Sequence, residues 1–460
     1  MTAPKPRASA MRPLPALRIH RRQPFSGVLP ALLVGGALAA PLLTPGAHAQ
    51  GWAPALPLNG PLTAPGAMQV PSQPAALGVP RLAGQVSCPA LQQRLLAVIG
   101  SESPVWSVSV ADPSGRLLAD VNGLQPRVPA SNQKLLSTAF ALDRLGPDFR
   151  LSTQLWRLSD GTMRLTGQGD PDLAVPQLQR FAKLVASTSG GQPVRLELAE
   201  LPSQAWWPQG WASGDRGTAY GAPVTRLAIT SNVIEEAVMN PPARLRTLLG
   251  RALTQQGARA DVNLVDASAP LPRDAVLVHE EPSTSMQGLL SLANTESHNF
   301  TAEVLLRAAA GTWNLDQAAR AETDWLTNQG LPMQGVRIFD GSGLTRTNRL
   351  TSRFLAALLL RMDQHPYGRD YIASMAIAGQ RGTLRNLYNG TSLDGRLFAK
   401  TGTLTGVRSI SGVLQTSDGP RYVSAISNGA SAPNRTIGSI LRQVQNVSLC
   451  AGGSNLVPQL

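Results

Sequence analysis

The sequence predicts a mixed α/β (α+β) fold, in which helices flank an antiparallel sheet and a smaller domain is inserted after one helix. Alternating apolar and polar residues over 106–110, followed by a turn at 112–115, predict a β-hairpin. Three stretches separated by turn residues over 398–427 predict an antiparallel meander. Apolar residues at helical spacing over 131–145 and 437–447 predict flanking helices.

The first 49 residues are typical of a secretory signal peptide. Basic residues precede an apolar run over 27–43, and Ala47-His48-Ala49 is the small-residue site after which we expect cleavage. The run is shorter than the ~20 residues that a membrane span needs. We therefore expect a periplasmic protein with no transmembrane domain once the signal is removed; a retained N-terminal anchor is the alternative.

The remaining chain divides by composition. Residues 50–85 are rich in Pro, Ala and Gly and predict a flexible tether. The chain from residue 86 onward is too long for one ordinary domain. We expect the main domain at 86–150 and 269–452, an inserted domain with β-like stretches at 151–268, and a tail at 453–460.

The charge of the whole chain, +13, overstates its basic character. Six Lys or Arg residues and no acid lie in the first 49 residues, so +7 remains after cleavage. No nucleic-acid-binding motif accompanies this charge, so we expect no nucleic acid partner; an anionic envelope polymer fits better. The histidines show no metal-ligand spacing and no phosphate-binding loop is present, so we expect no metal and no cofactor.

The two cysteines lie near opposite ends of the expected mature chain. Cys88 directly precedes a short apolar-periodic segment, and Cys450 directly follows the last one. If these two helices pack antiparallel, the start of the first meets the end of the second. We therefore expect a Cys88–Cys450 disulfide in an oxidising compartment, with two unpaired buried thiols as the alternative.

Lysine is rare in this chain, with four lysines against 37 arginines. Ser131 and Lys134 lie at positions i and i+3 of the helix expected at 131–145, so their side chains share one face. A serine hydroxyl needs an adjacent base to become a nucleophile, and burial can lower the pKa of a lysine until it acts as one. Ser131 is the candidate nucleophile and Lys134 the candidate base; an ordinary surface pair is the alternative.

A second motif, Ser297-His298-Asn299, lies in a helical region. The hydroxyl of Ser297 can relay a proton to a leaving amine, and the carboxamide of Asn299 can hydrogen-bond Lys134 and a substrate. Taken alone, a residue that caps a helix is the simpler interpretation.

A third motif, Lys400-Thr401-Gly402-Thr403, lies on a predicted strand. Lys400 and Thr401 offer charge and donors for a terminal carboxylate, and we expect Lys400 to stay charged for this purpose. Gly402 lets a substrate backbone lie against the strand edge. The backbone N–H groups of Thr403 and Ser131 can form an oxyanion hole. A cationic strand residue near a turn is the alternative.

Each of the three motifs occurs once, and their order is the signature of penicillin-interacting serine acyl-transferases. From about Cys88 onward the chain resembles the D-alanyl-D-alanine carboxypeptidase/endopeptidase family of low-molecular-mass penicillin-binding proteins. Further matching segments are Gly169-Asp170-Pro171, Trp211, Tyr220-Gly221-Ala222-Pro223, Ser231-Asn232, Asp340-Gly341-Ser342-Gly343-Leu344, and Gly379 with Gly382-Thr383-Leu384.

The resemblance implies a DD-peptidase-like fold related to that of the β-lactamases, peptidoglycan stem peptides as substrate, and β-lactams as inhibitors. It implies these roles: nucleophile for Ser131, base for Lys134, relay for Ser297 and Asn299, and carboxylate or oxyanion contacts for Lys400, Thr401 and Thr403. The 166 residues between Ser131 and Ser297 exceed what a class A β-lactamase needs. Alternatives are a serine β-lactamase or esterase on the same scaffold, and a non-catalytic peptidoglycan-binding protein.

Overall fold

The computed structural model describes residues 81–453, which lie within one compact unit of the chain. The signal peptide expected at 1–49, nearly all of the tether and most of the tail therefore lie outside the described residues. Within 81–453, no helix is long and apolar enough to cross a bilayer.

The main sheet has six antiparallel strands in the order β2-β1-β11-β10-β9-β8. Its strands are β1 (Trp106–Ala111), β2 (Leu117–Val121), β8 (Ala376–Ile377), β9 (Leu397–Leu404), β10 (Val407–Thr416) and β11 (Gly419–Asn428). The predicted hairpin and the predicted meander are both present. They join because β1 pairs with β11, so the two ends of the chain build one sheet.

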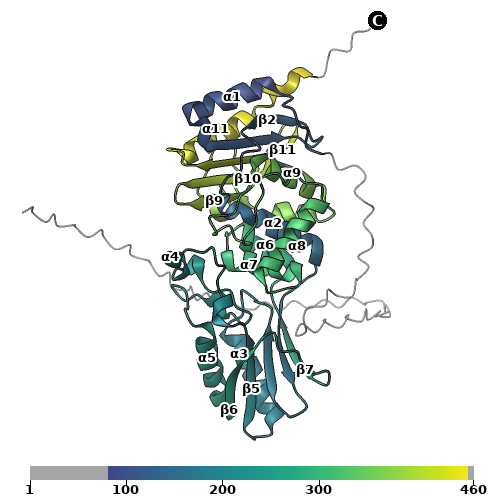
Figure 1. The fold of residues 1–460 in the computed structure, drawn as a ribbon, viewed down its shortest axis with the longest axis vertical. Coiled ribbons are helices and arrows are strands. Elements are labelled where there is room, and N and C mark those ends of the chain that lie inside the picture. Colours follow the sequence, from purple (N-terminus) through teal and green to yellow (C-terminus); the bar gives the residue numbers. More distant parts are fainter. Residues whose placement is uncertain (1–80, 454–460) are drawn as a thin grey trace, which may run out of the picture. The chain divides into compact units, whose positions relative to one another are not determined.

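Two helices from opposite ends of the chain, α1 (Pro89–Ile99) and α11 (Pro433–Gln445), lie side by side over one face of this sheet (Figure 1). Their apolar faces bury a core that includes Trp106 of β1. The predicted disulfide is confirmed: Cys88 and Cys450 are bonded, with 5.4 Å between their Cα atoms.

The other face of the sheet is covered by a second group of helices. They are α2 (Lys134–Leu145), α6 (Met286–Asn294), α7 (Asn299–Ala310), α8 (Leu315–Asn328), α9 (Ser352–Asp363) and α10 (Gly368–Ala373). Helix α2 packs against α6, α7 and α8, and every residue from Lys134 to Leu142 is buried. Its polar residues can therefore be satisfied only by other buried groups.

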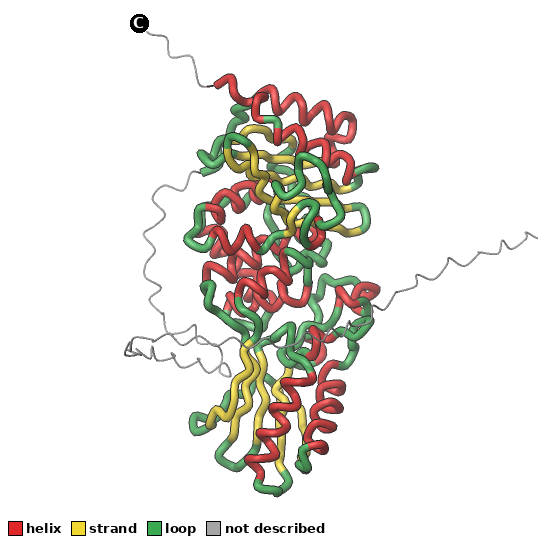
Figure 2. The backbone as a smooth tube through the Cα atoms, turned by 180° about the vertical axis from the view of Figure 1, so that it is seen from behind, coloured by secondary structure: helices red, strands yellow, loops and turns green. Residues whose placement is uncertain are grey.

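A second sheet has the strand order β6-β5-β4-β3-β7. Figure 2 shows it as the lower group of yellow strands, with helices packed beside it. Its elements are β3 (Ser152–Arg157), β4 (Met163–Gly167), α3 (Val175–Ser189), β5 (Val194–Glu200), α5 (Pro241–Gln255), β6 (Ala260–Asp266) and β7 (Val276–Pro282). Helices α3 and α5 connect parallel strands, as βαβ units require, and they pack on one another. Strand β7 pairs with β3, so this sheet continues beyond 268, where the sequence predicted the insertion to end.

Short helical turns connect these elements. They are η1 (Gly100–Val105), η2 (Ala130–Gln133), η3 (Ser203–Ala205), α4 (Ser213–Arg216), η4 (Ala219–Gly221), η5 (Ile229–Asn232), η6 (Gly382–Leu384) and η7 (Val447–Gly453). The α-helix expected from Ser131 begins only at Lys134, because η2 is a 3₁₀ turn. Ala130, the first residue of this turn, has a left-handed φ of 49°. The turn places Ser131 shortly before the start of α2.

Candidate active site

The side chains of Ser131 and Lys134 meet at the junction of η2 and α2. Ser131 is half-buried, whereas Lys134 is completely buried, and Lys134 Nζ lies 2.9 Å from Ser131 Oγ. Burial lowers the pKa of Lys134 to about 7, although the negative charges of Asp340 and Glu303 oppose this shift. About half of the lysine is therefore an uncharged amine at neutral pH.

The remaining contacts of Lys134 orient that amine. Its Nζ donates to Asn299 Oδ1 at 2.6 Å and to the Ser342 carbonyl at 2.7 Å. Neither oxygen can donate a hydrogen bond, so these two acceptors take both hydrogens of a neutral amine. The nitrogen lone pair is then directed at the third partner, Ser131 Oγ.

Asn299 is the first residue of α7, and its carboxamide is fixed from both ends. Its Nδ2 donates to the Tyr220 carbonyl at 2.8 Å, so its Oδ1 must face Lys134. The Tyr220 carbonyl belongs to the segment between the strands of the second sheet, which thereby supports the site directly.

Ser297 occupies the loop between α6 and α7 with a left-handed φ of 63°. This conformation is uncommon for a residue other than glycine and often marks a functional site. Its Oγ accepts a hydrogen bond from Lys400 Nζ at 2.9 Å. Burial lowers the pKa of the adjacent His298 to about 4, so this imidazole is neutral at physiological pH.

Lys400 on β9 is also completely buried, and its Nζ donates to Ser297 Oγ and to the Thr401 carbonyl. Burial and the charge of Lys134 lower the pKa of Lys400 well below its ordinary value. Burial thus opposes the charged form that the sequence led us to expect for Lys400, and that charge stays a prediction. A carboxylate within hydrogen-bond reach would raise this pKa again, which couples anion binding to proton uptake.

Gly402 lies in close contact with the η2 turn, in addition to the role at the strand edge that the sequence predicts. A Cβ at this position would lie 2.2 Å from Ser409 Oγ, 2.8 Å from the Pro129 carbonyl oxygen and 3.1 Å from Ser131 N. Gly402 therefore makes room for the chain's own η2 turn. This close approach brings the backbone N–H of Ser131 next to β9 at Gly402, the residue before the predicted oxyanion partner Thr403.

One edge of β9 is open at the site. Strand β8 pairs only with Phe398 and Ala399, so no strand of the described chain covers this edge from Lys400 onward. The hydroxyl of Thr401 donates to that of Thr383 at 2.7 Å beside this edge. An extended peptide can pair with such an edge through its backbone.

A cavity of about 530 Å³ adjoins the Ser297 loop. Its lining includes Ser297, His298 and Asn299 on one side, and Asp172 and Tyr220 from the second-sheet region on the other. Within residues 81–453, no group of three or more His, Cys, Asp or Glu side chains is arranged to hold a metal ion.

Sequence reasoning missed two kinds of contributor to this site. Backbone carbonyls such as that of Ser342 leave no trace in a motif of side chains. Glu303 supports the site from α7, and a signal for it was available: Glu303 and Arg307 are the only charged residues in an otherwise largely apolar helix, four positions apart.

The comparisons with known proteins identify the family. Residues 100–243 and 234–444 match the D-Ala-D-Ala carboxypeptidase 3 (S13) family, so the chain belongs to it. A D-alanyl-D-alanine carboxypeptidase of Actinomadura sp. (strain R39) is 28% identical over 429 residues, covering 72% of this chain and 79% of that protein. A carboxypeptidase of Mycobacterium tuberculosis is 30% identical over 369 residues, covering 71% and 79%.

The fold is shared with solved structures. Penicillin-binding protein 4 of Haemophilus influenzae superposes with a TM-score of 0.68 at 18% identity, covering 78% of this chain and 99% of that one. The predicted family and fold class are thus confirmed, and the chain is a serine-type D-Ala-D-Ala carboxypeptidase, a hydrolase.

Proposed function

We propose that Ser131 is the nucleophile with which this protein cleaves the terminal D-Ala–D-Ala bond of peptidoglycan stem peptides. One observation carries the proposal: Lys134, fully buried, has two acceptors for its hydrogens and a third partner, Ser131 Oγ. This arrangement supplies the base that a serine nucleophile needs.

In the acylation step, Ser131 Oγ bonds to the carbonyl carbon of the penultimate D-Ala while its proton passes to Lys134. The backbone N–H groups of Ser131 and Thr403 stabilise the charge on the carbonyl oxygen. The C–N bond then breaks as the leaving nitrogen takes the proton held on Lys134, relayed through Ser297, which leaves Lys134 neutral again. Water later attacks the ester, which releases the shortened peptide and returns the proton to Ser131.

The terminal carboxylate of the substrate is held by Lys400 and Thr401 on the open edge of β9. Because Lys400 lies 2.9 Å from Ser297 Oγ, the bound carboxylate and the proton relay share one cation. A substrate whose terminal carboxylate is amidated would leave Lys400 buried without a counter-charge, which disfavours its protonated form.

Release of D-Ala from a pentapeptide ending in D-Ala-D-Ala tests this function. Wild type should release one D-Ala per peptide, while Ser131→Ala should release none; D-Ala release by Ser131→Ala at the wild-type rate would refute the role of Ser131. Mass spectrometry of digested muropeptides tests whether the protein is also an endopeptidase, because cross-linked dimers become monomers only if cross-links are cut.

Two other functions remain distinguishable by experiment. Rapid turnover of a chromogenic cephalosporin would indicate a serine β-lactamase or esterase. Stable binding to cell walls without D-Ala release would indicate a non-catalytic peptidoglycan-binding protein. The fully assembled contacts of Lys134 favour catalysis over the second alternative.

We further propose that the protein acts in the periplasm after removal of residues 1–49. The Cys88–Cys450 disulfide supports an oxidising compartment. N-terminal sequencing of protein recovered from the periplasm should begin at Gln50; an intact N-terminus in the membrane fraction would contradict it.

A further inference from the structure

The loop formed by residues 340–344 contacts Lys134, the proposed base, and lies between helix α7 and the η2 turn. On one side it packs against α7: a Cβ at Gly341 would lie 2.7 Å from the Ala302 carbonyl oxygen. On the other it packs against η2: a Cβ at Gly343 would lie 1.9 Å from the Ala130 carbonyl oxygen. The 340–344 loop is therefore closely packed between α7 and the turn that carries Ser131.

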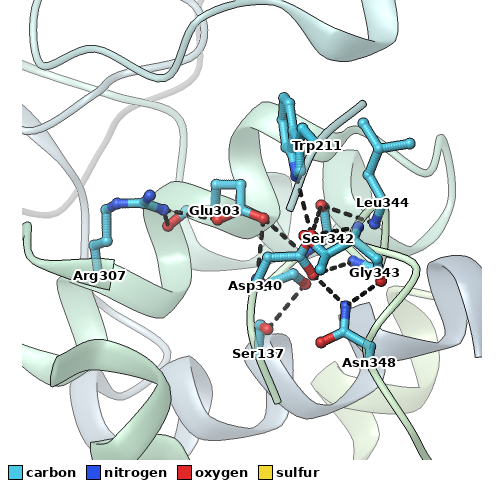
Figure 3. Close-up of polar contacts among 11 residues, drawn as sticks. Ser137, Trp211, Glu303, Arg307, Asp340, Ser342, Gly343, Leu344 and Asn348 are labelled. Carbon is cyan, nitrogen blue, oxygen red and sulfur yellow. Dashed lines mark hydrogen bonds and ion pairs between the residues drawn. The ribbon is translucent and has the colours of Figure 1, made fainter. Parts of the chain in front are cut away.

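Two buried carboxylates fix this loop (Figure 3). Asp340 closes it from within, because its carboxylate accepts from the backbone N–H groups of Gly343 and Thr345 and from Trp211 Nε1. Glu303 holds it from α7, and a single oxygen of Glu303 accepts from two successive backbone N–H groups of the loop.

Two hydrogen bonds in series connect Glu303 to Lys134 through the backbone of Ser342. Glu303 Oε1 lies 2.9 Å from Ser342 N and 3.0 Å from Gly341 N. The carbonyl of Ser342 in turn lies 2.7 Å from Lys134 Nζ. The other Glu303 oxygen accepts from Arg307 at 2.8 Å, so the carboxylate is satisfied on both sides.

We propose that Glu303 is a positioning residue for acylation, which anchors the Ser342 carbonyl where it holds the amine of Lys134. Without that anchor the Gly341–Ser342 peptide can rotate and displace Ser342, which shifts one of the two acceptors that direct the lone pair of Lys134. The inference rests on the proposed function, since it assigns Glu303 a role through Lys134.

The charge of Glu303 adds an electrostatic effect. The titratable groups around Lys134 are Glu303 on α7, Asp340 in the loop, Lys400 on β9 and His298 before α7. Glu303 and Asp340 raise the pKa of Lys134 against the effect of burial. Removing the charge of Glu303 should therefore lower this pKa and move the basic form to lower pH.

The chain offers a matched control in Glu322 on α8. Glu322 is also completely buried, and burial raises its pKa well above the ordinary value. Neither carboxyl oxygen of Glu322 has a hydrogen-bond partner among the described residues, so Glu322→Gln removes no bond to the 340–344 loop. Burial and the nearby Asp340 raise the pKa of Glu303 as well, while Arg307 and Ser342 lower it. Glu303→Gln differs in that it alters a carboxylate that two backbone N–H donors and Arg307 contact.

The test measures the rate of acylation by a fluorescent penicillin from pH 5 to pH 9 in the full-length protein. The acylation rate should rise with pH to a plateau. In Glu303→Gln the midpoint of this rise (the pH limb) should lie about one pH unit lower, and the plateau rate should fall on the order of tenfold. Glu322→Gln should leave the limb in place. A wild-type limb and plateau in Glu303→Gln, or equal shifts in both variants, would overturn the proposal.

Thermal unfolding reports whether Glu303→Gln still folds. If it does not, Ser137→Ala provides the second test, because Ser137 Oγ anchors the same loop by donating to the Gly341 carbonyl at 3.0 Å. Its plateau should fall roughly fivefold with an unshifted limb; an unchanged plateau would overturn the proposal. A wild type that penicillin does not label would refute the proposed function itself.

Discussion

The rate of acylation should follow the deprotonation of Lys134. With a pKa of about 7, the amine is neutral in about 90% of molecules at pH 8, about 10% at pH 6 and about 1% at pH 5. Only the neutral amine can take the proton of Ser131, so the rate should fall about tenfold for each pH unit well below 7. An unperturbed lysine would place the same limb above pH 10.

Single-turnover acylation by a saturating fluorescent penicillin isolates this effect. At saturation the carboxylate of the β-lactam is already bound next to Lys400, so the first-order rate reports Lys134 alone. At low penicillin concentration the second-order rate also depends on the protonation of Lys400. Comparing the two conditions therefore separates the protonation of Lys134 from that of Lys400.

The refuting result is specific. A saturating rate that is flat from pH 5 to pH 9 would mean that no group with a pKa near 7 acts as the base. A single limb above pH 9 would mean that burial does not lower the pKa of Lys134. Acid unfolding is excluded as the cause by monitoring tryptophan fluorescence over the same range.

Three further substitutions test other parts of the site and the fold. Lys134→Arg should abolish penicillin labelling, because arginine cannot deprotonate in the site. Lys400→Arg should retain measurable labelling. Equal, near-normal labelling of both variants would contradict the two roles. Gly402→Ala should lower the acylation rate on the order of tenfold and destabilise the fold by about 1–3 kcal/mol in thermal unfolding, because its methyl would lie 2.2 Å from Ser409 Oγ; wild-type labelling would argue against this close approach. Cys88→Ser should reduce stability in urea unfolding by up to about 5 kcal/mol; an unchanged midpoint would show that the disulfide contributes little.

The sequence alone could predict those features of the fold that depend on local pattern. The alternation over 106–110 and the turn at 112–115 define a hairpin wherever it packs. The start of α2 was predicted three residues early, because the left-handed Ala130 and the 3₁₀ turn of η2 arise from packing against β9. That β7 pairs with β3 is a non-local contact with no local signal.

The candidate site divides in the same way. Ser131, Lys134, Ser297, Asn299 and Lys400 could be proposed because the three motifs that contain them occur in the order of the family signature. Their mutual distances could not, and neither could the burial that lowers the pKa of Lys400.

The supporting groups were least visible from the sequence. The Ser342 and Tyr220 carbonyls are backbone atoms, which any residue can supply. Glu303 acts through a loop that lies 37 residues further along the chain, so only the fold brings it to Lys134.

Mass spectrometry of the penicillin-treated protein tests the central claim most directly. We predict one covalent adduct, mapped by peptide sequencing to Ser131, and no adduct on Ser131→Ala under the same conditions. An adduct on any other residue, or a Ser131→Ala protein that is still acylated, would contradict Ser131 as the nucleophile.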